Sequence, residues 1–264
     1  MPAVKIAVMG FGVVGSGTVE LFYKNKDIIE KHCGKSVDIK YILDLRDFPD
    51  SPYRDKLTKN FEDILSDPEV SVVAELMGGK TFAYDYTKRL LGAGKSVVTS
   101  NKELVAAYGA ELLKVSKENG CNYLFEASVG GGIPIIRPLH QCLAANRFEK
   151  IAGILNGTTN YILTKMIYDQ MSFDEALSQA QALGYAEKDP TADVDGHDAT
   201  RKLCILGSLA FGRHIYPKYV HCSGIRKITL DDVEYAEDAG YAIKLIGLIA
   251  VSYTHLTLPT NSRV

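Results

Sequence analysis

The chain has 264 residues, of which 46% are hydrophobic and 23% charged, a balance typical of globular proteins that excludes a disordered or low-complexity chain. Thirty Lys and Arg residues against 32 Asp and Glu residues give a net charge of -2 without a basic cluster, which excludes the usual surface of a nucleic-acid-binding protein. The longest strongly apolar stretches, 203–211 and 243–251, are shorter than the roughly 18 residues that a membrane-spanning helix needs. The sequence therefore predicts no nucleic-acid or membrane partner.

The cysteines and the N-terminus indicate the cellular compartment. Five cysteines without a C-x-x-C pair argue against a disulfide framework and a thiolate zinc site, so we expect reduced and mostly buried thiols. The N-terminal MPAVKIAVMG runs directly into a glycine loop and lacks the features of a signal peptide. We therefore expect a cytoplasmic protein.

The first 125 or so residues alternate β-branched runs with amphipathic patterns, which is typical of βαβ units and a parallel sheet. The fold class predicted is α/β, a Rossmann-type doubly wound parallel sheet followed by a second α+β domain for substrate binding and dimerisation. Strands are expected at 4–9, 37–43, 70–77, 96–99 and 122–125, and helices at 14–29, 61–65, 83–91 and 103–118.

The alternation stops at 128–134, where three glycines and a proline occur together. The predicted domains are therefore 1–127, a dinucleotide-binding domain, and 128–251, an incomplete substrate domain, followed by the segment 252–264. In the second domain we expect a strand at 150–155, helices at 159–168, 195–211 and 231–239, a capped helix between Ser172 and Gly184, and a strand from about Ala242.

A glycine-rich loop follows the first strand and opens the first helix. Gly10 allows the tight turn, Gly12 lets a pyrophosphate approach the backbone, and Gly15 permits close packing of helix and strand. The free N–H groups at the helix start attract phosphate. We expect a bound dinucleotide at Gly10, Phe11, Gly12, Val13, Val14 and Gly15, although a purely structural glycine turn is the alternative.

The second strand ends at Asp44-Leu45-Arg46, where a dinucleotide-binding fold recognises the adenosine ribose. Asp44 suits the free 2′-hydroxyl of NAD and Arg46 the 2′-phosphate of NADP, so the choice between NAD and NADP stays open at this point. The alternative is that both are ordinary charges of a solvated loop.

Ser100-Asn101-Lys102 follows another strand, at the sheet edge where ligands of open α/β sheets bind. Lys102 is predicted to point toward this crevice. The alternative is a surface charge at a helix start, a position that the helix dipole disfavours for lysine.

The densest cluster of charged residues is GYAEKDPTADVDGHDATRKL, at 184–203. Asp198 and Lys202 are four residues apart and share one helix face, with Asp195 expected one turn earlier. The alternative is an exposed ion pair that stabilises the helix by about 0.3 to 0.5 kcal/mol. His197 is predicted to be a surface residue, since no second histidine lies at metal-binding spacing.

With these residues in view, the chain resembles the homoserine dehydrogenase family over roughly residues 1–250. The family's motifs GFGVVG, SNKELVA, EASVGGGIPII, NGTTNYIL and GYAEKDPTADVDGHDATRKL occur in order. The resemblance implies reversible interconversion of L-homoserine and L-aspartate 4-semialdehyde with NADP or NAD, a step toward threonine and methionine, in a homodimer. An aspartate semialdehyde dehydrogenase would instead need a thiol nucleophile with a nearby base, a setting that Cys121 and Cys142 lack.

The resemblance also implies roles for single residues. Lys202 is the expected proton donor and acceptor, and Lys102 a second catalytic lysine that contacts cofactor and substrate. The residues expected to hold the substrate are Glu187, Asp193 and Asp198. Besides the glycine loop, Asp44 and Arg46, the residues expected at the cofactor are Ser100, Lys102 and Gly184. The main-chain oxygens expected around a monovalent cation such as sodium are those of Glu126, Val129, Gly131 and Ile133.

The resemblance stops near Ala250, and the following VSYTHLTLPTNSRV shows no motif of the family. The family's pattern continues with more of the substrate domain and a segment that returns to the first domain. We therefore expect 252–264 to be a non-native tail and turnover to be weak or absent. A dinucleotide-binding module without catalysis is the alternative function.

Overall fold

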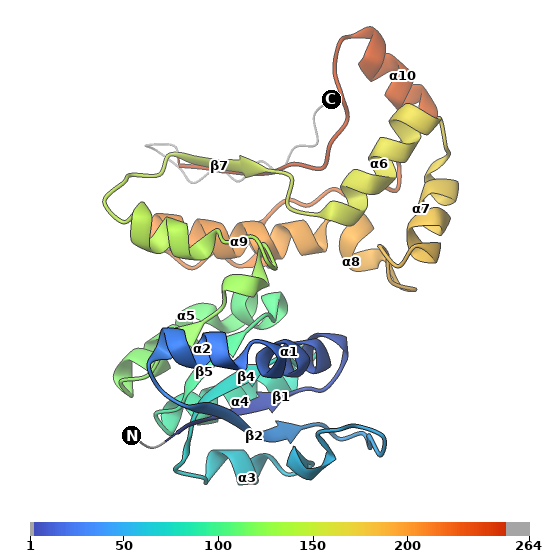
Figure 1. Ribbon diagram of the computed structural model, residues 1–264. Coiled ribbons are helices and arrows are strands. Elements are labelled where there is room, and N and C mark those ends of the chain that lie inside the picture. Colours follow the sequence, from blue (N-terminus) through green and yellow to red (C-terminus); the bar gives the residue numbers. More distant parts are fainter. Residues whose placement is uncertain (1–2, 252–264) are drawn as a thin grey trace. The chain divides into compact units, whose positions relative to one another are not determined.

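A computed structural model describes residues 3–251 (Figure 1). The contacts between residues divide the chain into two compact units, and the division falls between Pro134 and Ile135. The segment 252–264, expected from the sequence to be non-native, lies outside the described residues.

Unit 1 is built on a six-stranded sheet in which every neighbouring pair of strands is parallel. The strand order β3-β2-β1-β4-β5-β6 is the order of the dinucleotide-binding Rossmann fold, so the predicted fold class is confirmed. The strands are β1 (Val4–Met9), β2 (Val37–Leu43), β3 (Leu57–Thr58), β4 (Val70–Glu75), β5 (Ser96–Thr99) and β6 (Tyr123–Leu124).

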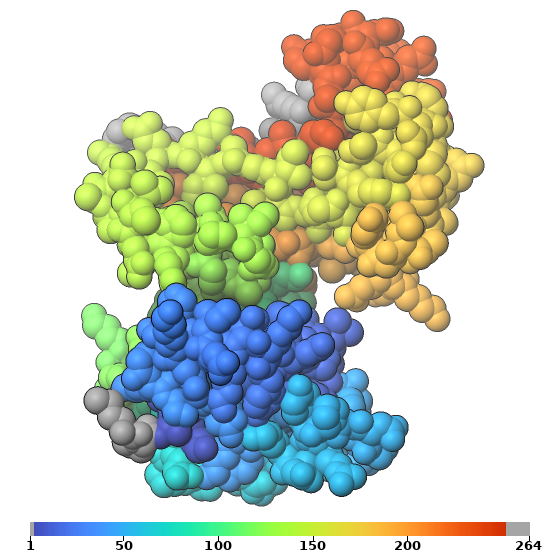
Figure 2. Space-filling view, in the orientation of Figure 1, coloured from blue at the N-terminus to red at the C-terminus, as the bar shows by residue number. Residues whose placement is uncertain are grey.

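Helices connect these strands. The direction in which strands are added to the sheet reverses at β1. Right-handed crossovers therefore place the helices that connect β1 to β3 on one face of the sheet and the helices that connect β4 to β6 on the opposite face. In agreement, α1 contacts α2, and α4 contacts both α3 and α5. The atoms of α1 and α2 form part of the visible surface of this unit (Figure 2). The helices are α1 (Val13–Lys24), α2 (Lys26–Cys33), α3 (Phe61–Leu65), α4 (Thr81–Gly92) and α5 (Lys102–Glu118).

The apolar core of unit 1 reaches the glycine loop. Val8 at the end of β1, Phe11 in the loop and Val19 in α1 are buried in one cluster with Ile42 of β2. The Phe11 ring packs edge-on against Phe48 at a centroid distance of 5.0 Å. The loop is therefore fixed by core packing on one side while its other side faces solvent.

The observed boundaries correct several predictions. The single helix expected over 14–29 is two helices, because Asn25 leaves the helical conformation (φ -111°, ψ 17°) and its side-chain amide donates to the Leu21 carbonyl oxygen. Strand β4, expected to extend to residue 77, ends at Glu75. The Glu75 carboxyl accepts the Met77 N–H, which a longer strand would use to pair with a neighbouring strand. Corrections also apply to the helix expected from 195, which begins at His197, the strand expected over 150–155, which ends at Gly153, and the strand expected from 242, which begins at Gly247.

Over the described residues 135–251, unit 2 is mainly helical and contains one antiparallel strand pair, β7 (Lys150–Gly153) with β8 (Gly247–Ala250). The predicted capping box of α7 is confirmed: the Ser172 hydroxyl accepts the Glu175 N–H, and the Glu175 carboxyl accepts the Ser172 N–H. Buried side chains of the helices α6 to α10 form its core. The helices are α6 (Gly157–Asp169), α7 (Phe173–Ala182), α8 (Thr191–Val194), α9 (His197–Phe211) and α10 (Leu230–Asp238).

Two general expectations are also resolved within residues 3–251. No helix there is long and apolar enough to cross a membrane. All five cysteines are free, but the expectation that they are mostly buried is wrong, since only Cys204 is buried while Cys33 and Cys142 are exposed. Burial raises the pKa of the Cys204 thiol to about 12.

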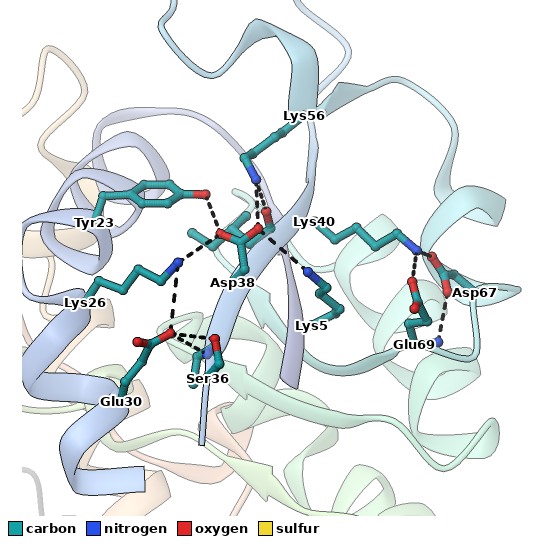
Figure 3. A network of polar contacts seen from close by, with 12 residues as sticks. Lys5, Tyr23, Lys26, Glu30, Ser36, Asp38, Lys40, Lys56, Asp67 and Glu69 are labelled. Carbon is teal, nitrogen blue, oxygen red and sulfur yellow. Dashed lines mark hydrogen bonds and ion pairs between the residues drawn. The ribbon is translucent and has the colours of Figure 1, made fainter. Parts of the chain in front are cut away.

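Polar side chains anchor β2 to its surroundings (Figure 3). Asp38 accepts hydrogen bonds from the Tyr23 hydroxyl (3.2 Å) and the Lys56 ammonium (3.1 Å). Lys5 and Lys26 lie 3.9 and 3.8 Å from the same carboxylate. Partial burial raises the pKa of Asp38, but Lys56, Tyr23 and Lys26 outweigh this effect, so the pKa lies below its usual range.

Replacing Asp38 with asparagine is expected to lower the free energy of unfolding at pH 7 by about 1 kcal/mol. A carboxyl whose pKa is lower in the folded state stabilises the fold above its unfolded-state pKa, and this contribution is lost as the pH falls through the folded-state pKa. The difference between Asp38→Asn and the unmodified chain should thus be constant from pH 7 to 5 and shrink below about pH 4, near the pKa of an unperturbed Asp. Urea titrations at each pH measure it. Asp55→Asn, whose side chain is 91% exposed, is the control, and an equal effect there would contradict the assignment.

Candidate active site

The glycine loop of unit 1 has the geometry that the sequence predicts. Gly10 adopts φ +94°, and a Cβ there would lie 2.7 Å from the Leu76 carbonyl oxygen. A Cβ at Gly15 would collide with the carbonyl oxygen of Gly10. At Gly12, by contrast, an added Cβ would have only the Arg46 guanidinium within 4 Å, at 3.7 Å, among the described residues. Gly10 and Gly15 are thus required by the fold, whereas the open space at Gly12 is what an approaching pyrophosphate needs.

A solvent-open cavity of about 970 Å³ lies beside this loop at the carboxyl ends of the strands. This is the edge of an open α/β sheet where ligands bind. Its wall includes large apolar side chains that are exposed to solvent, Leu45 at 77% and Phe82 at 69%. The remaining lining residues are Gly10, Gly12, Leu43, Asp44, Arg46, Lys59, Leu76, Met77, Gly78 and Tyr86.

Asp44 and Arg46 both line the cavity, but they differ in how far their side chains are already used in contacts within the protein. The Asp44 carboxylate accepts the Phe11 N–H (2.8 Å) and forms a two-point contact with the Arg46 guanidinium (3.0 and 2.8 Å). Hydrogen bonds from Arg46 hold the pKa of Asp44 well below its usual range. The Arg46 side chain is 63% exposed at the cavity, and Lys59, also on the cavity wall, is 56% exposed.

Ser100 and Lys102 lie where predicted, after β5 and at the first position of α5. Asn101 caps this helix, since its side-chain oxygen accepts the Leu104 N–H (3.0 Å). Lys102 is partly buried. The cap therefore fixes the position from which the Lys102 side chain extends.

In unit 2, Asp198 and Lys202 of α9 form an ion pair of 2.8 Å that is largely buried, with side-chain exposures of 2% and 17%. The Lys202 ammonium also donates to the Leu155 carbonyl oxygen (3.0 Å). The alternative interpretation of Asp198 and Lys202 as an exposed ion pair is therefore wrong. A buried carboxylate–ammonium pair beside the end of β7 is found instead.

Asn156 joins two carboxylates of this cluster. Its side-chain amide donates to Asp193 (2.7 Å) and Asp198 (2.9 Å), while its oxygen accepts the Thr159 N–H (2.8 Å) at the start of α6. Sequence reasoning did not single out Asn156. The available signal was an asparagine at the strand-to-helix turn of NGTTNYIL, a position where its oxygen serves as the helix cap and leaves its amide free to donate elsewhere.

Other predicted residues of unit 2 lie outside this cluster. Asp195 precedes α9, because Gly196 takes φ +83°, and it pairs with Arg226 rather than lying on the Asp198 face. Glu187 and Gly184 lie on an exposed loop between α7 and α8, where the Glu187 carbonyl oxygen accepts from Gln181 (3.0 Å). His197 is exposed, as predicted.

The segment with the expected cation ligands follows β6. Glu126 lies in a single 3₁₀ turn, and the Gly130 carbonyl oxygen accepts the Ile133 N–H (2.9 Å) across a turn in which Gly131 has φ +59°. Val129 is buried and Ile133 is 72% exposed. No group of three or more His, Cys, Asp or Glu side chains that could hold a metal ion occurs within residues 3–251.

The Rossmann strand order and the glycine loop beside an open cavity define unit 1 as a dinucleotide-binding domain, and unit 2 presents a buried carboxylate–lysine cluster. The family model for the homoserine dehydrogenase NAD-binding domain matches residues 10–126, and that for homoserine dehydrogenase matches 134–263. The chain belongs to the homoserine dehydrogenase family.

Individual relatives agree. The chain is 44% identical over 253 residues to homoserine dehydrogenase of Bacillus subtilis, covering 94% of this chain and 58% of that protein. A crystal structure of a homoserine dehydrogenase from Thiobacillus denitrificans superposes with a TM-score of 0.89 at 40% identity, over 95% of this chain and 59% of the other. A hyperthermophilic archaeal homoserine dehydrogenase solved in complex with NADPH gives a TM-score of 0.78 at 27% identity, over 94% and 79%. The chain thus spans a little under three fifths of the first two relatives.

Proposed function

We propose that the residues of this chain serve the oxidation of L-homoserine to L-aspartate 4-semialdehyde and the reverse reduction, with a nicotinamide dinucleotide bound to unit 1 and acid–base chemistry supplied by unit 2. The observation that carries the proposal is the buried Lys202–Asp198 pair, tied through Asn156 to Asp193. Family membership and the dinucleotide-binding fold of unit 1 support it.

The residues around the glycine loop fit a dinucleotide. The open space at Gly12 lies at the start of α1, whose first N–H groups and dipole favour a phosphate. Leu45 and Phe82 offer exposed apolar surface to a base in the same cavity. When bound, the nicotinamide supplies the hydride acceptor for homoserine oxidation and the donor for the reverse reaction.

NADP is the cofactor that the cavity favours. Asp44 is already engaged by the Phe11 N–H and by Arg46, so its carboxylate is poorly placed to accept a ribose hydroxyl. Arg46 and Lys59 pair with Asp44 and Asp47 (2.8 and 2.7 Å), but their side chains stay 63% and 56% exposed on the cavity wall, which suits a 2′-phosphate. The relative solved with NADPH supports the same choice.

Lys202 is proposed to remove the hydroxyl proton of homoserine as oxidation proceeds and to return it in the reverse direction. An ammonium has three protons, and the contacts to Asp198 and the Leu155 carbonyl oxygen use two of them. In the reductive direction the third proton is left to pass to the aldehyde oxygen of the substrate. In the oxidative direction Lys202 acts as the neutral amine, whose lone pair takes up the hydroxyl proton while the hydride passes to the nicotinamide. Lys102, at the capped start of α5, is the second lysine of the proposal and lies at the cofactor-binding edge of unit 1.

The substrate's ammonium group is proposed to bind carboxylates of unit 2, namely Asp193, Asp198 and the loop residue Glu187. Asn156 holds Asp193 and Asp198 in one place before the substrate arrives. Positioning of this kind reduces the cost of orienting the substrate in the transition state. Gly184 and Ser100 complete the proposed cofactor contacts.

Three parts of the proposal come from the family resemblance. They are a monovalent cation held by the main-chain oxygens of Glu126, Val129, Gly131 and Ile133, assembly as a homodimer, and a cytoplasmic location. A dinucleotide-binding module without catalysis is the competing function.

The decisive experiment measures reduction of NADP and of NAD, tested separately, with L-homoserine as donor. It uses this chain and a chain extended to the length of the curated relatives. We expect homoserine-dependent reduction in the extended chain, with NADP preferred by about tenfold or more because two cations face the 2′-phosphate. NADPH binding without reduction in either chain would favour the binding module, and a preference for NAD would contradict the role given to Arg46 and Lys59.

A further inference from the structure

Glu75 is a carboxyl group enclosed within the sheet of unit 1. It is the last residue of β4, is 0% exposed, and lies in register with Met9 of β1 on one side and Thr99 of β5 on the other. An acidic side chain in such a position is costly unless hydrogen bonds satisfy it. The mechanism proposed for homoserine oxidation assigns it no role.

Each oxygen of the Glu75 carboxyl accepts a hydrogen bond. One accepts the Met77 N–H (2.9 Å) and the other the Thr99 hydroxyl (2.6 Å). Burial raises the pKa of Glu75, while hydrogen bonds from Thr99, Met77 and Asn101 act in the opposite direction. The donors converge on a group that accepts at both oxygens, which a carboxylate does and an amide does not.

Asn101 extends this network to the neighbouring turn. Its main-chain N–H donates to the Thr99 hydroxyl oxygen (2.9 Å), and its side-chain amide donates to the carbonyl oxygens of Gly79 (2.6 Å) and Met77 (3.4 Å). The N–H and the carbonyl of Met77 are thus held by two different side chains. Because Asn101 also caps α5, the same network fixes the position of Lys102.

The segment held in this way is part of the cavity wall. Leu76, Met77 and Gly78 line the cavity next to Gly10 and Gly12. In a sheet of this strand order, β1 to β3 form the half that binds the adenosine end of a dinucleotide, and β4 to β6 form the half that binds the nicotinamide end. The residues that Glu75 holds therefore belong to the nicotinamide half.

We propose that Glu75 is a positioning residue for the nicotinamide half of the bound dinucleotide, acting through Thr99 and Asn101 on the main chain of residues 76–79. The inference rests on the proposed function only in requiring that unit 1 binds NADP(H). Glu75 itself lies behind the cavity wall and acts by holding that wall in one conformation.

The test compares the dissociation constants of NADPH and of 2′,5′-ADP, a ligand that carries the adenosine half alone. Glu75→Gln leaves one of the two donors without its acceptor, and Thr99→Val removes the link to Asn101. Each should weaken NADPH binding by about tenfold, the effect of losing one well-placed hydrogen bond, and change 2′,5′-ADP binding by less than about twofold. Thr99→Ser, which keeps the hydroxyl, should restore NADPH affinity.

Thr87→Val is the matched control. Thr87 is a buried threonine of α4 whose hydroxyl has no hydrogen-bond partner within residues 3–251, so its loss should leave both affinities unchanged. Equal weakening of both ligands by Glu75→Gln and Thr99→Val, or unchanged NADPH affinity, would overturn the role of Glu75. Failure of the unmodified chain to bind either ligand would contradict the proposed function itself, and this inference with it.

Discussion

Replacing Lys202 with arginine is expected to reduce homoserine-dependent turnover by about three orders of magnitude while leaving the protein folded and able to bind NADPH. Arginine keeps a positive charge beside the buried Asp198 carboxylate, but its guanidinium does not release a proton in proteins. Lys202 is not among the residues that line the dinucleotide cavity, so NADPH affinity should not change. Turnover is measured in the extended chain, and NADPH affinity by the fluorescence of the reduced nicotinamide.

Two other variants separate catalysis from stability. Lys202→Met removes the cation that lies 2.8 Å from the buried Asp198 carboxylate, and we expect it to lower the free energy of unfolding by about 3 kcal/mol. Lys165→Arg alters a lysine that also pairs with an aspartate four residues along a helix, Asp169, but in a more exposed pair (29% and 47%), and it should keep full turnover. Full turnover in Lys202→Arg would show that the proton is carried by another group.

Replacing Gly12 with alanine is expected to weaken NADPH binding by about two orders of magnitude while changing the free energy of unfolding by no more than about 1 kcal/mol. The unliganded fold has room for the added methyl group, since only the Arg46 guanidinium lies near it among the described residues. The methyl group would occupy the space through which a pyrophosphate approaches the start of α1.

The neighbouring glycines provide the comparison. In Gly15→Ala the new Cβ collides with the Gly10 carbonyl oxygen, so we expect a loss of stability of about 3 kcal/mol along with the loss of binding. Gly17→Ala lies within α1, where no described residue comes within 4 Å of the new Cβ, and should leave binding unchanged. Urea unfolding and NADPH titration of the three variants measure both quantities. If Gly12→Ala binds NADPH as tightly as Gly17→Ala does, the pyrophosphate does not lie on this loop.

The second half of the chain shows where sequence reasoning reached its limit. The four-residue spacing of Asp198 and Lys202 correctly placed both side chains on one helix face, because helical periodicity is local. It could not decide between an exposed pair and a buried one, since burial depends on what packs against α9. The same spacing placed Asp195 on the helix, and this prediction was wrong. Gly196 ends the preceding turn, so the helix begins two residues later than expected.

The sequence by itself determined that this protein has a Rossmann-type dinucleotide-binding unit, because the spacing of Gly10, Gly12 and Gly15 after an apolar strand reflects steric requirements within a few neighbouring residues. Only the tertiary structure decided which polar groups meet: Asn156 reaches Asp193 and Asp198, which lie 37 and 42 residues away, and Glu75 reaches Thr99, which lies 24 residues away. Such contacts depend on how whole strands and helices pack, and no local pattern in the sequence specifies that packing. The sequence analysis did not single out Glu75: the fold decides that it is buried and which groups it meets there.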